Sequence, residues 1–278
     1  MGFVICDVYL EPDYNARYHV LLFSGGFKTH FETMLSLLAL AIAPGAAITV
    51  YIYSRDKYDR EPLKPLLISF LLGMAATVPA IFIQNKLKPV VYGLFPGGNL
   101  WYYILLSFIV VAASEEGCKF IMLRLYAYRH KAFNEPFDGI IYSVMVSMGF
   151  ATLENIGYVL SSGFTTGIIR MFLSVPSHGA FAVLMGYHTG LAKFDKPRGI
   201  QHMIKGVLLA IFFHGAFDLF LLLQNNLYLK QYVSNWLLLA GALIPWFIAI
   251  RMSIKSIRMH EDLSKRHFYK NNNSITEV

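Results

Sequence analysis

Charged residues and cysteines are scarce in this chain. Only 15% of its 278 residues are Asp, Glu, Lys or Arg, well below the roughly 25% of an ordinary soluble domain. The two cysteines, Cys6 and Cys118, do not imply a disulfide framework. The chain also lacks a Walker phosphate-binding loop, a dinucleotide-binding fingerprint and an internal repeat. Nucleotide-dependent enzymes and repeat architectures are therefore not indicated.

Hydrophobic residues, by contrast, make up 56% of the chain, and the mean hydropathy is +0.49. About 20 consecutive apolar residues are enough to cross a bilayer as a helix. The sequence therefore predicts an all-α, polytopic transmembrane helical bundle, a multi-pass protein of the cell membrane. We expect about seven spans, near residues 34–54, 65–84, 101–126, 138–161, 169–192, 204–224 and 234–254.

The basic residues are distributed unevenly between the predicted loops. Most of the 24 Lys and Arg fall after the first, third and fifth spans and in the C-terminal tail, and only six, Arg170 among them, fall on the other side. The positive-inside rule then places the C-terminus in the cytoplasm and the N-terminus outside. The net charge of +7 is explained by this topology, so nucleic-acid binding is not expected.

Three segments are predicted. Residues 1–33 form an N-terminal extracytoplasmic arm that does not have the pattern of a cleaved signal sequence, because acidic residues interrupt its apolar stretches. Residues 34–255 form the transmembrane domain. Residues 256–278 form a polar cytoplasmic tail, which we expect to be solvated or disordered.

Two adjacent glutamates, Glu115 and Glu116, interrupt the third predicted span. An ionised carboxylate in hydrocarbon is costly, and two side by side resist ionising together, so such residues usually face a wet cavity or a partner. Lys119 follows Glu115 by one helical turn and can offset part of the charge. The alternative is a buried Glu–Lys pair that only sets the register of two helices.

Other spans carry further polar groups. Glu154 and Tyr158 share one helical face, and the next span contains His178. His214 and Asp218 are four residues apart, so the carboxylate can fix the tautomer of the imidazole. Each of these could be a structural pairing between helices. With the N-terminus outside, however, they all fall at similar depths between the midplane and the external face, which favours a single hydrated site.

Such a layer of carboxylates and imidazoles suits hydrolysis. One carboxylate of a pair can act as base and the other as acid, and a glutamate can activate water for attack on a carbonyl. Imidazole N–H groups could stabilise the oxyanion, by ~3 kcal/mol per donor. Covalent catalysis is less favoured, because neither Ser114 nor Cys118 has a local His.

A metal-dependent variant of this chemistry is the alternative. Glu and His are good zinc ligands, but the His-Glu-x-x-His signature is absent, so we expect metal-free chemistry and no cofactor. If zinc or another divalent metal is bound, the candidate ligands are Glu116, Glu154, His178 and His214.

Taken in order, these motifs resemble the PrsW family, which is similar to the type II CAAX prenyl-proteases and bacteriocin-processing membrane proteases. The resemblance covers roughly residues 35–255 and includes Ala43-Pro44-Gly45 and the loop around Asp56 and Glu61. The main motifs are Glu115-Glu116-x-x-Lys119, Gly149-Phe150-Ala151-Thr152-Leu153-Glu154-Asn155-x-x-Tyr158, His178 followed by Met185-Gly186-Tyr187, and His214-Gly215-x-x-Asp218.

The resemblance implies an intramembrane endopeptidase, a hydrolase whose protease domain is residues 34–255. Its substrate would be a single-pass membrane protein cut at or near the external face of the lipid bilayer. By resemblance this is site-1 cleavage of an anti-sigma factor, a regulated proteolysis in the stress response. The implied catalytic residues are Glu115, Glu116, Glu154, His178, His214 and Asp218, supported by Lys119, Asn155 and Tyr158.

Two other functions use the same groups. A proton-coupled transporter or sensor could use them as a proton relay, although the chain shows no pseudo-repeat of the kind that many transporters have. A CAAX-type peptide-maturation protease would act on a lipidated C-terminus that faces the cytoplasm.

Overall fold

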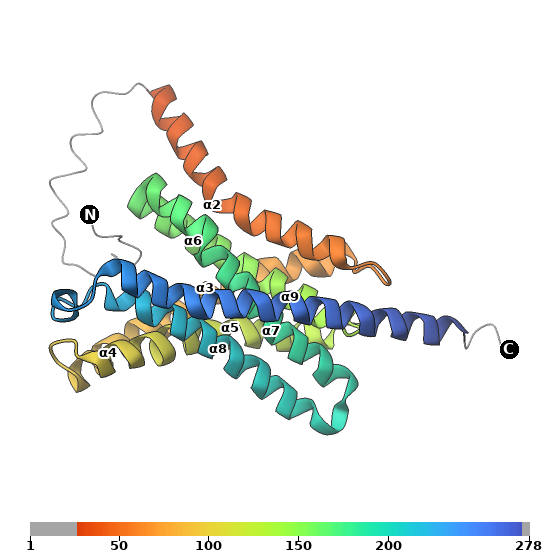
Figure 1. Ribbon diagram of the computed structural model, residues 1–278. Coiled ribbons are helices and arrows are strands. Elements are labelled where there is room, and N and C mark those ends of the chain that lie inside the picture. The colour runs from red at the N-terminus through yellow and green to blue at the C-terminus, as the bar shows by residue number, and fades with distance from the viewer. Residues whose placement is uncertain (1–26, 274–278) are drawn as a thin grey trace.

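The computed structural model describes residues 27–273, with side chains over 33–270, and this part of the chain contains no β-strand. The all-α prediction is confirmed. Within these residues, eight α-helices and four short 3-10 or π segments follow one another: α2 Phe27–Arg55, α3 Leu63–Leu94, α4 Leu100–Leu105, η1 Leu106–Ala112, α5 Ala113–Leu125, η2 Ala127–Arg129, α6 Asp138–Phe172, α7 Ser174–Phe194, η3 Lys196–Arg198, α8 Gly199–Leu223, η4 Leu229–Gln231 and α9 Asn235–Asn273 (Figure 1).

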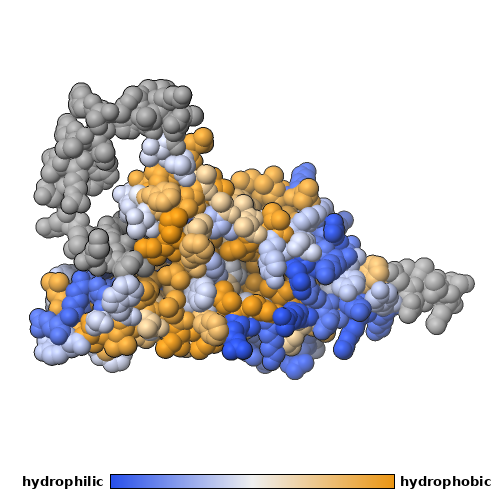
Figure 2. Space-filling view, turned by 45° about the horizontal axis from the view of Figure 1, so that its top comes forward, coloured by the Kyte–Doolittle hydropathy of each residue, from blue (hydrophilic) through white to orange (hydrophobic). Residues whose placement is uncertain are grey.

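Within the described residues, five helical stretches are long and apolar enough to cross a membrane. One of them, Asp138–Phe194, includes both α6 and α7. The predicted span near 101–126 corresponds to the continuous run of α4, η1 and α5. Figure 2 shows hydrophobic side chains over the middle of the molecule and hydrophilic ones gathered where α9 ends. This is the pattern of a polytopic membrane protein; the number of crossings and their orientation stay predictions.

Helix α6 lies at the centre of the bundle. It packs against α2, α3 and α7, while α8 packs against α7 and α9. The backbones of α3 and α6 approach closely where Gly73 faces Val146 and Gly149 faces Phe70. A Cβ on either glycine would collide with the carbonyl group of the facing residue. Small residues at such crossings are typical of membrane helices.

The chain reverses direction at Gly163, inside the stretch assigned to α6. Gly163 has φ 81°, a left-handed conformation that glycine adopts readily. Glu154 and Arg170 are 16 residues apart, about 24 Å along a straight helix, yet their side chains are 2.9 Å apart. Residues 164–172 therefore run back along the preceding part of α6 and lead into α7.

Two predicted boundaries differ from the structure. Helix α9 continues to Asn273 instead of ending near 254, because Ile257, His260 and Ser264 are buried against the bundle. Arg55 also donates a hydrogen bond of 2.6 Å to Glu261. The predicted polar tail, 256–278, therefore begins inside a helix. The predicted arm, 1–33, overlaps the start of α2, and residues 1–26 lie outside the described part of the chain.

Four carboxyl groups are buried at the end of the bundle where α2 joins α3 and where α6 begins: Asp56, Glu61, Glu135 and Asp138. Burial raises the pKa of Asp56 to about 6 and the pKa values of Glu61 and Glu135 to about 7. The hydroxyl of Tyr142 donates a hydrogen bond to Glu61. This cluster lies at the end that the basic loops assign to the cytoplasm.

Candidate active site

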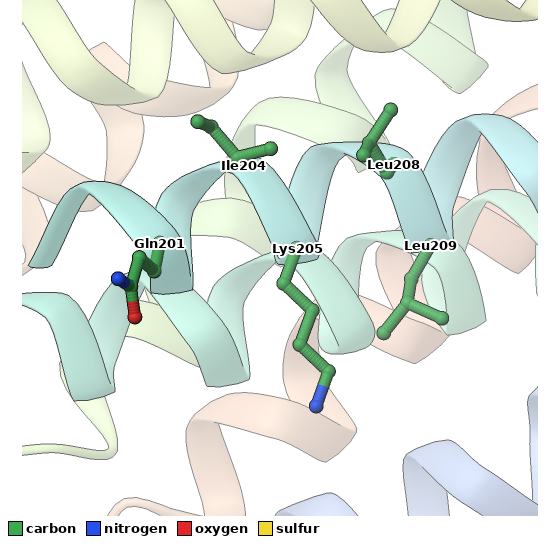
Figure 3. A pocket seen from close by; sticks show the side chains of 5 residues that line it. All are labelled: Gln201, Ile204, Lys205, Leu208 and Leu209. Atoms are coloured by element: carbon green, nitrogen blue, oxygen red, sulfur yellow. The ribbon is translucent and has the colours of Figure 1, made fainter. Parts of the chain in front are cut away.

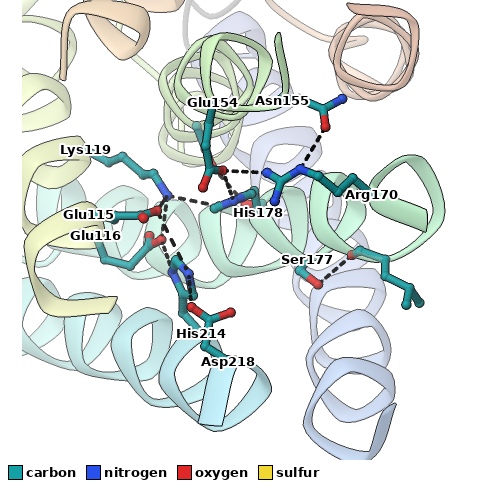
Figure 4. A network of polar contacts seen from close by, with 12 residues as sticks. Glu115, Glu116, Lys119, Glu154, Asn155, Arg170, Ser177, His178, His214 and Asp218 are labelled. Carbon is teal, nitrogen blue, oxygen red and sulfur yellow. Dashed lines mark hydrogen bonds and ion pairs between the residues drawn. The ribbon is translucent and has the colours of Figure 1, made fainter. Parts of the chain in front are cut away.

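Four helices bring the polar residues of the spans together in one cluster (Figure 4). Helix α5 begins immediately after the π-helical segment η1 and carries its acidic pair in its first turn. π-helical turns often mark functional sites. The residues brought together are Glu115, Glu116 and Lys119 from α5, Glu154 from α6, His178 from α7, and His214 and Asp218 from α8.

The two adjacent glutamates share the ammonium group of Lys119. The Nζ atom lies 2.7 Å from Glu116 Oε1 and 3.5 Å from Glu115 Oε2. All three side chains are almost completely buried. The lysine therefore partly offsets the two carboxylates, as the helical spacing predicted.

His214 lies between two carboxylates. Its Nδ1 is 2.8 Å from Glu116 Oε1 and its Nε2 is 3.3 Å from Asp218 Oδ2. The ring of Phe181 stacks on the imidazole at 5.3 Å between centroids. The pairing of His214 with Asp218 that the sequence predicted is thus present, and the imidazole is held on both edges and one face.

His178 is held between Lys119 and Glu154. Its Nδ1 is 3.0 Å from Lys119 Nζ, and its Nε2 is 3.0 Å from Glu154 Oε2. An ammonium group can only donate, so Nδ1 accepts and the proton is on Nε2, which donates to Glu154. The network thus assigns the tautomer. The rings of His178 and His214 are 5.2 Å apart.

Arg170 is a member of this cluster that the sequence analysis missed. The distribution of basic residues assigns it to the external side, at the start of the predicted span 169–192, but its side chain is buried and its Nη2 donates to Glu154 Oε2 at 2.9 Å. The reversal at Gly163 explains the difference. Tyr158, expected as a supporting residue of the site, lies with its ring against the guanidinium group of Arg170, 4.0 Å from the ring centroid. The sequence feature that could have identified Arg170 is its position among apolar neighbours along the chain.

Two amide side chains complete the surroundings. Gln84 on α3, also missed, donates to Glu115 Oε1 at 3.1 Å. The sequence feature that could have identified Gln84 is a single amide side chain directly after the apolar residues 81–83. Asn155 was expected to support the site, and it donates to the carbonyl oxygen of Ala41 on α2 at 2.9 Å.

The residues of the cluster fit a divalent metal. Glu115, Glu116, His178 and His214 each offer one ligand atom, and these atoms lie within 4.8 Å of one another. Glu115 Oε2 and Glu116 Oε2 are buried without a hydrogen-bond partner in the described part of the chain. Lys119 donates to Glu116 Oε1 and to His178 Nδ1, and an ion bound to His178 would replace the lysine at Nδ1, whose single lone pair can serve only one of them. Carboxylate and imidazole donors suit zinc.

Two carboxylate side chains of the cluster are partly exposed at the molecular surface. The side chains of Glu154 and Asp218 are each 21% exposed, whereas the other members are nearly sealed. Glu154 lies closer to the reversal at Gly163 than to the start of α6, and His178 lies near the start of α7. The cluster is therefore off-centre, toward the end of the bundle opposite the basic loops.

A separate hollow of about 440 Å³ lies on α8 (Figure 3). It shares no residue with the Glu/His cluster, and apolar side chains dominate its wall. Its lining residues are Gln201, Ile204, Lys205, Leu208 and Leu209.

Comparison with known proteins identifies the family. Residues 61–250 match the family described as PrsW family intramembrane metalloprotease. The chain is 40% identical over 193 residues to Protease PrsW of Geobacillus kaustophilus, which covers 69% of this chain and 83% of that protein. It is 34% identical over 227 residues to Protease PrsW of Bacillus subtilis, covering 80% and 96%.

A third relative, Protease PrsW of Clostridioides difficile, is 33% identical over 246 residues, which covers 85% of this chain and 96% of that protein. No solved structure matches the chain significantly. The resemblance predicted from the motifs is confirmed, and with it a protease in a multi-pass membrane protein. The chain belongs to the PrsW family of intramembrane metalloproteases.

Proposed function

We propose that this protease hydrolyses a peptide bond of a membrane-anchored protein at or near the external face, using the Glu/His cluster. One observation carries the proposal. Carboxylates from α5 and imidazoles from α7 and α8 lie within 4.8 Å of one another inside a lipid-embedded bundle. A protein that only needed to join helices would not require four such groups in contact.

Glu116, His178 and His214 would hold a divalent metal such as zinc, whose chemistry when bound is to polarise the scissile carbonyl. This proposal revises the metal-free chemistry expected from the sequence. It also removes Glu154 from the set of candidate metal ligands. The family description and the free carboxylate oxygens support the revision. Glu154 and Asp218 hold the two imidazoles through their other nitrogen atoms, as outer-shell carboxylates commonly do.

Glu115 is the better placed of the two glutamates to act as general base. Its Oε2 has no hydrogen-bond partner among the described residues, and it is farther from Lys119 than Glu116 is. In the proposed reaction, a water oxygen attacks the carbonyl carbon while its proton passes to Glu115. Glu115 then gives the proton to the amide nitrogen as the C–N bond breaks.

The proposed substrate class is a single-pass membrane protein. The off-centre cluster and the positive-inside rule together support cleavage near the external face. By family likeness, we propose an anti-sigma factor as the natural substrate, with cleavage acting in stress signalling.

The test is co-expression of a candidate single-pass substrate with wild-type protein, Glu115→Gln or Glu116→Gln. Each substitution should reduce cleavage by about 100-fold or more, because loss of a group that acts in the transition state typically costs that much. Asp262→Asn, an exposed acid on α9, is the matched control and should cleave normally. Chelation of the purified protein should also abolish cleavage, and zinc should restore it. Normal cleavage by a stable Glu116→Gln protein would refute the proposal.

A further inference from the structure

Arg170 is a permanently charged side chain buried in the membrane part of the bundle, 4% exposed. Ionisable residues in such places are costly and are found with specific partners. Its partners include the carboxylate of Glu154, the amide oxygen of Asn155 and the ring of Tyr158, all on α6. Its position therefore depends on the reversal of the chain at Gly163.

The guanidinium group contacts two neighbouring side chains through different nitrogen atoms. Nη2 donates to Glu154 Oε2 and Nε donates to Asn155 Oδ1, both at 2.9 Å. Because a guanidinium group is planar and rigid, these two bonds fix both acceptors relative to each other. A lysine at this position could compensate the charge but could not reproduce the fork.

Asn155 anchors this fork to a third helix. Its amide nitrogen donates to the carbonyl oxygen of Ala41 on α2, three residues before Pro44, which lies inside that helix. The two bonds leave the amide of Asn155 a single orientation, with its oxygen toward Arg170. The guanidinium group is thus linked through Asn155 to the main chain of α2.

The same carboxylate oxygen then contacts the cluster. Glu154 Oε2 receives Arg170 Nη2 and also lies 3.0 Å from His178 Nε2. The location of this oxygen determines where the Nε2–H of His178 points. It therefore also determines the direction of Nδ1, which faces Lys119 and the glutamate pair (Figure 4). Arg170 is thus linked to the metal-binding residue His178 through Glu154.

We propose that Arg170 is a positioning residue of the protease, which acts through Glu154 to hold the tautomer and orientation of His178. The inference rests on the proposed function of the Glu/His cluster. It explains why a costly buried arginine lies next to an acidic residue whose other partner is an imidazole of the site.

The experiment compares full-length Arg170→Met, Arg170→Lys and Glu154→Gln proteins, reconstituted with a cleavable single-pass substrate. Arg170→Met should lower kcat roughly 10- to 100-fold with little change in KM, as loss of an outer-shell partner does. Arg170→Lys should lower kcat by a smaller factor than Arg170→Met does. In the Glu154→Gln background, Arg170→Met should cause little further loss, because both residues act on one group. Arg55→Met, which breaks another Arg–Glu pair, should cleave normally.

Folded Arg170→Met protein with wild-type kcat would overturn the inference, as would a loss that is fully additive with Glu154→Gln. If Arg170→Met does not fold, the Arg170→Lys protein is the test, since lysine keeps the compensating charge. A wild-type kcat for Arg170→Lys would equally overturn the inference. A Glu116→Gln protein that still cleaves would instead refute the proposed function, so the two failures are distinguishable.

Discussion

At the scale of single residues, Gln84 gives the sharpest prediction. Its side chain on α3 donates a hydrogen bond to the glutamate pair, through Glu115 Oε1 at 3.1 Å. A hydrogen bond to a charged group contributes about 1.5–3 kcal/mol, and a buried acceptor left without its donor costs a similar amount. Gln84 therefore helps to hold the proposed base in place.

We expect Gln84→Leu to reduce the cleavage rate about 10-fold or more, because the carboxylate of Glu115 loses this donor. The measurement is the initial rate of substrate cleavage by purified protein. Gln201→Leu, on the outer surface of α8, is a matched control that should cleave normally. An unchanged rate for Gln84→Leu would show that this contact does not matter for the site.

At the scale of elements, the crossing of α3 and α6 determines where Glu154 lies. Gly149, one and a half turns before Glu154, lets the two backbones approach so closely that no Cβ fits against Phe70. Extra atoms in a tightly packed contact typically cost about 1–3 kcal/mol. The glycine thus has a packing role, whereas Gly157 on the same helix has nothing within 4 Å of a hypothetical Cβ.

We accordingly expect Gly149→Ala to lower the thermal unfolding midpoint in detergent, since α3 must move away from α6. Gly157→Ala should leave the midpoint unchanged or raise it, because alanine stabilises a helix relative to glycine. Both are followed in the same thermal scan. Equal midpoints for the two variants would contradict the close packing of α3 on α6.

The sequence was sufficient for those parts of the site that depend on local spacing. Glu116 and Lys119, or His214 and Asp218, share a helical face, and their apolar surroundings made them conspicuous. Arg170 could not be assigned in the same way, because its role depends on a reversal at Gly163 that hydropathy does not reveal. The length of α9 was also missed, since polar residues such as His260 are buried there only by tertiary contacts.

At the scale of the whole molecule, the two ends of the bundle differ in charge and in chemistry. The end with the basic loops also contains the buried carboxyl groups of Asp56, Glu61 and Glu135. Burial raises their pKa values to about 6, 7 and 7. The folded protein therefore binds more protons here than the unfolded chain does between pH ~4 and ~7, since unfolded carboxyl groups have pKa values near 4.

From this linkage we expect these groups to make the protein less stable as the pH rises from about 4 to about 7, with no further loss from them above that range. Glu135→Gln should make the unfolding midpoint less sensitive to pH, because one raised carboxyl group is removed. Unfolding in detergent at several pH values measures the effect, with Asp262→Asn as control. A Glu135→Gln protein as pH-sensitive as the wild type would contradict the prediction.

The cluster is open only at Glu154 and Asp218, while its reacting groups are nearly sealed. A transmembrane helix keeps its carbonyl groups engaged in its own hydrogen bonds. Under the proposed function, such a segment must locally unwind before one of its peptide bonds can enter. Selectivity would then follow how easily a stretch of polypeptide frays at the bilayer surface, and a rigid, uninterrupted helix would be spared whatever side chains it displays.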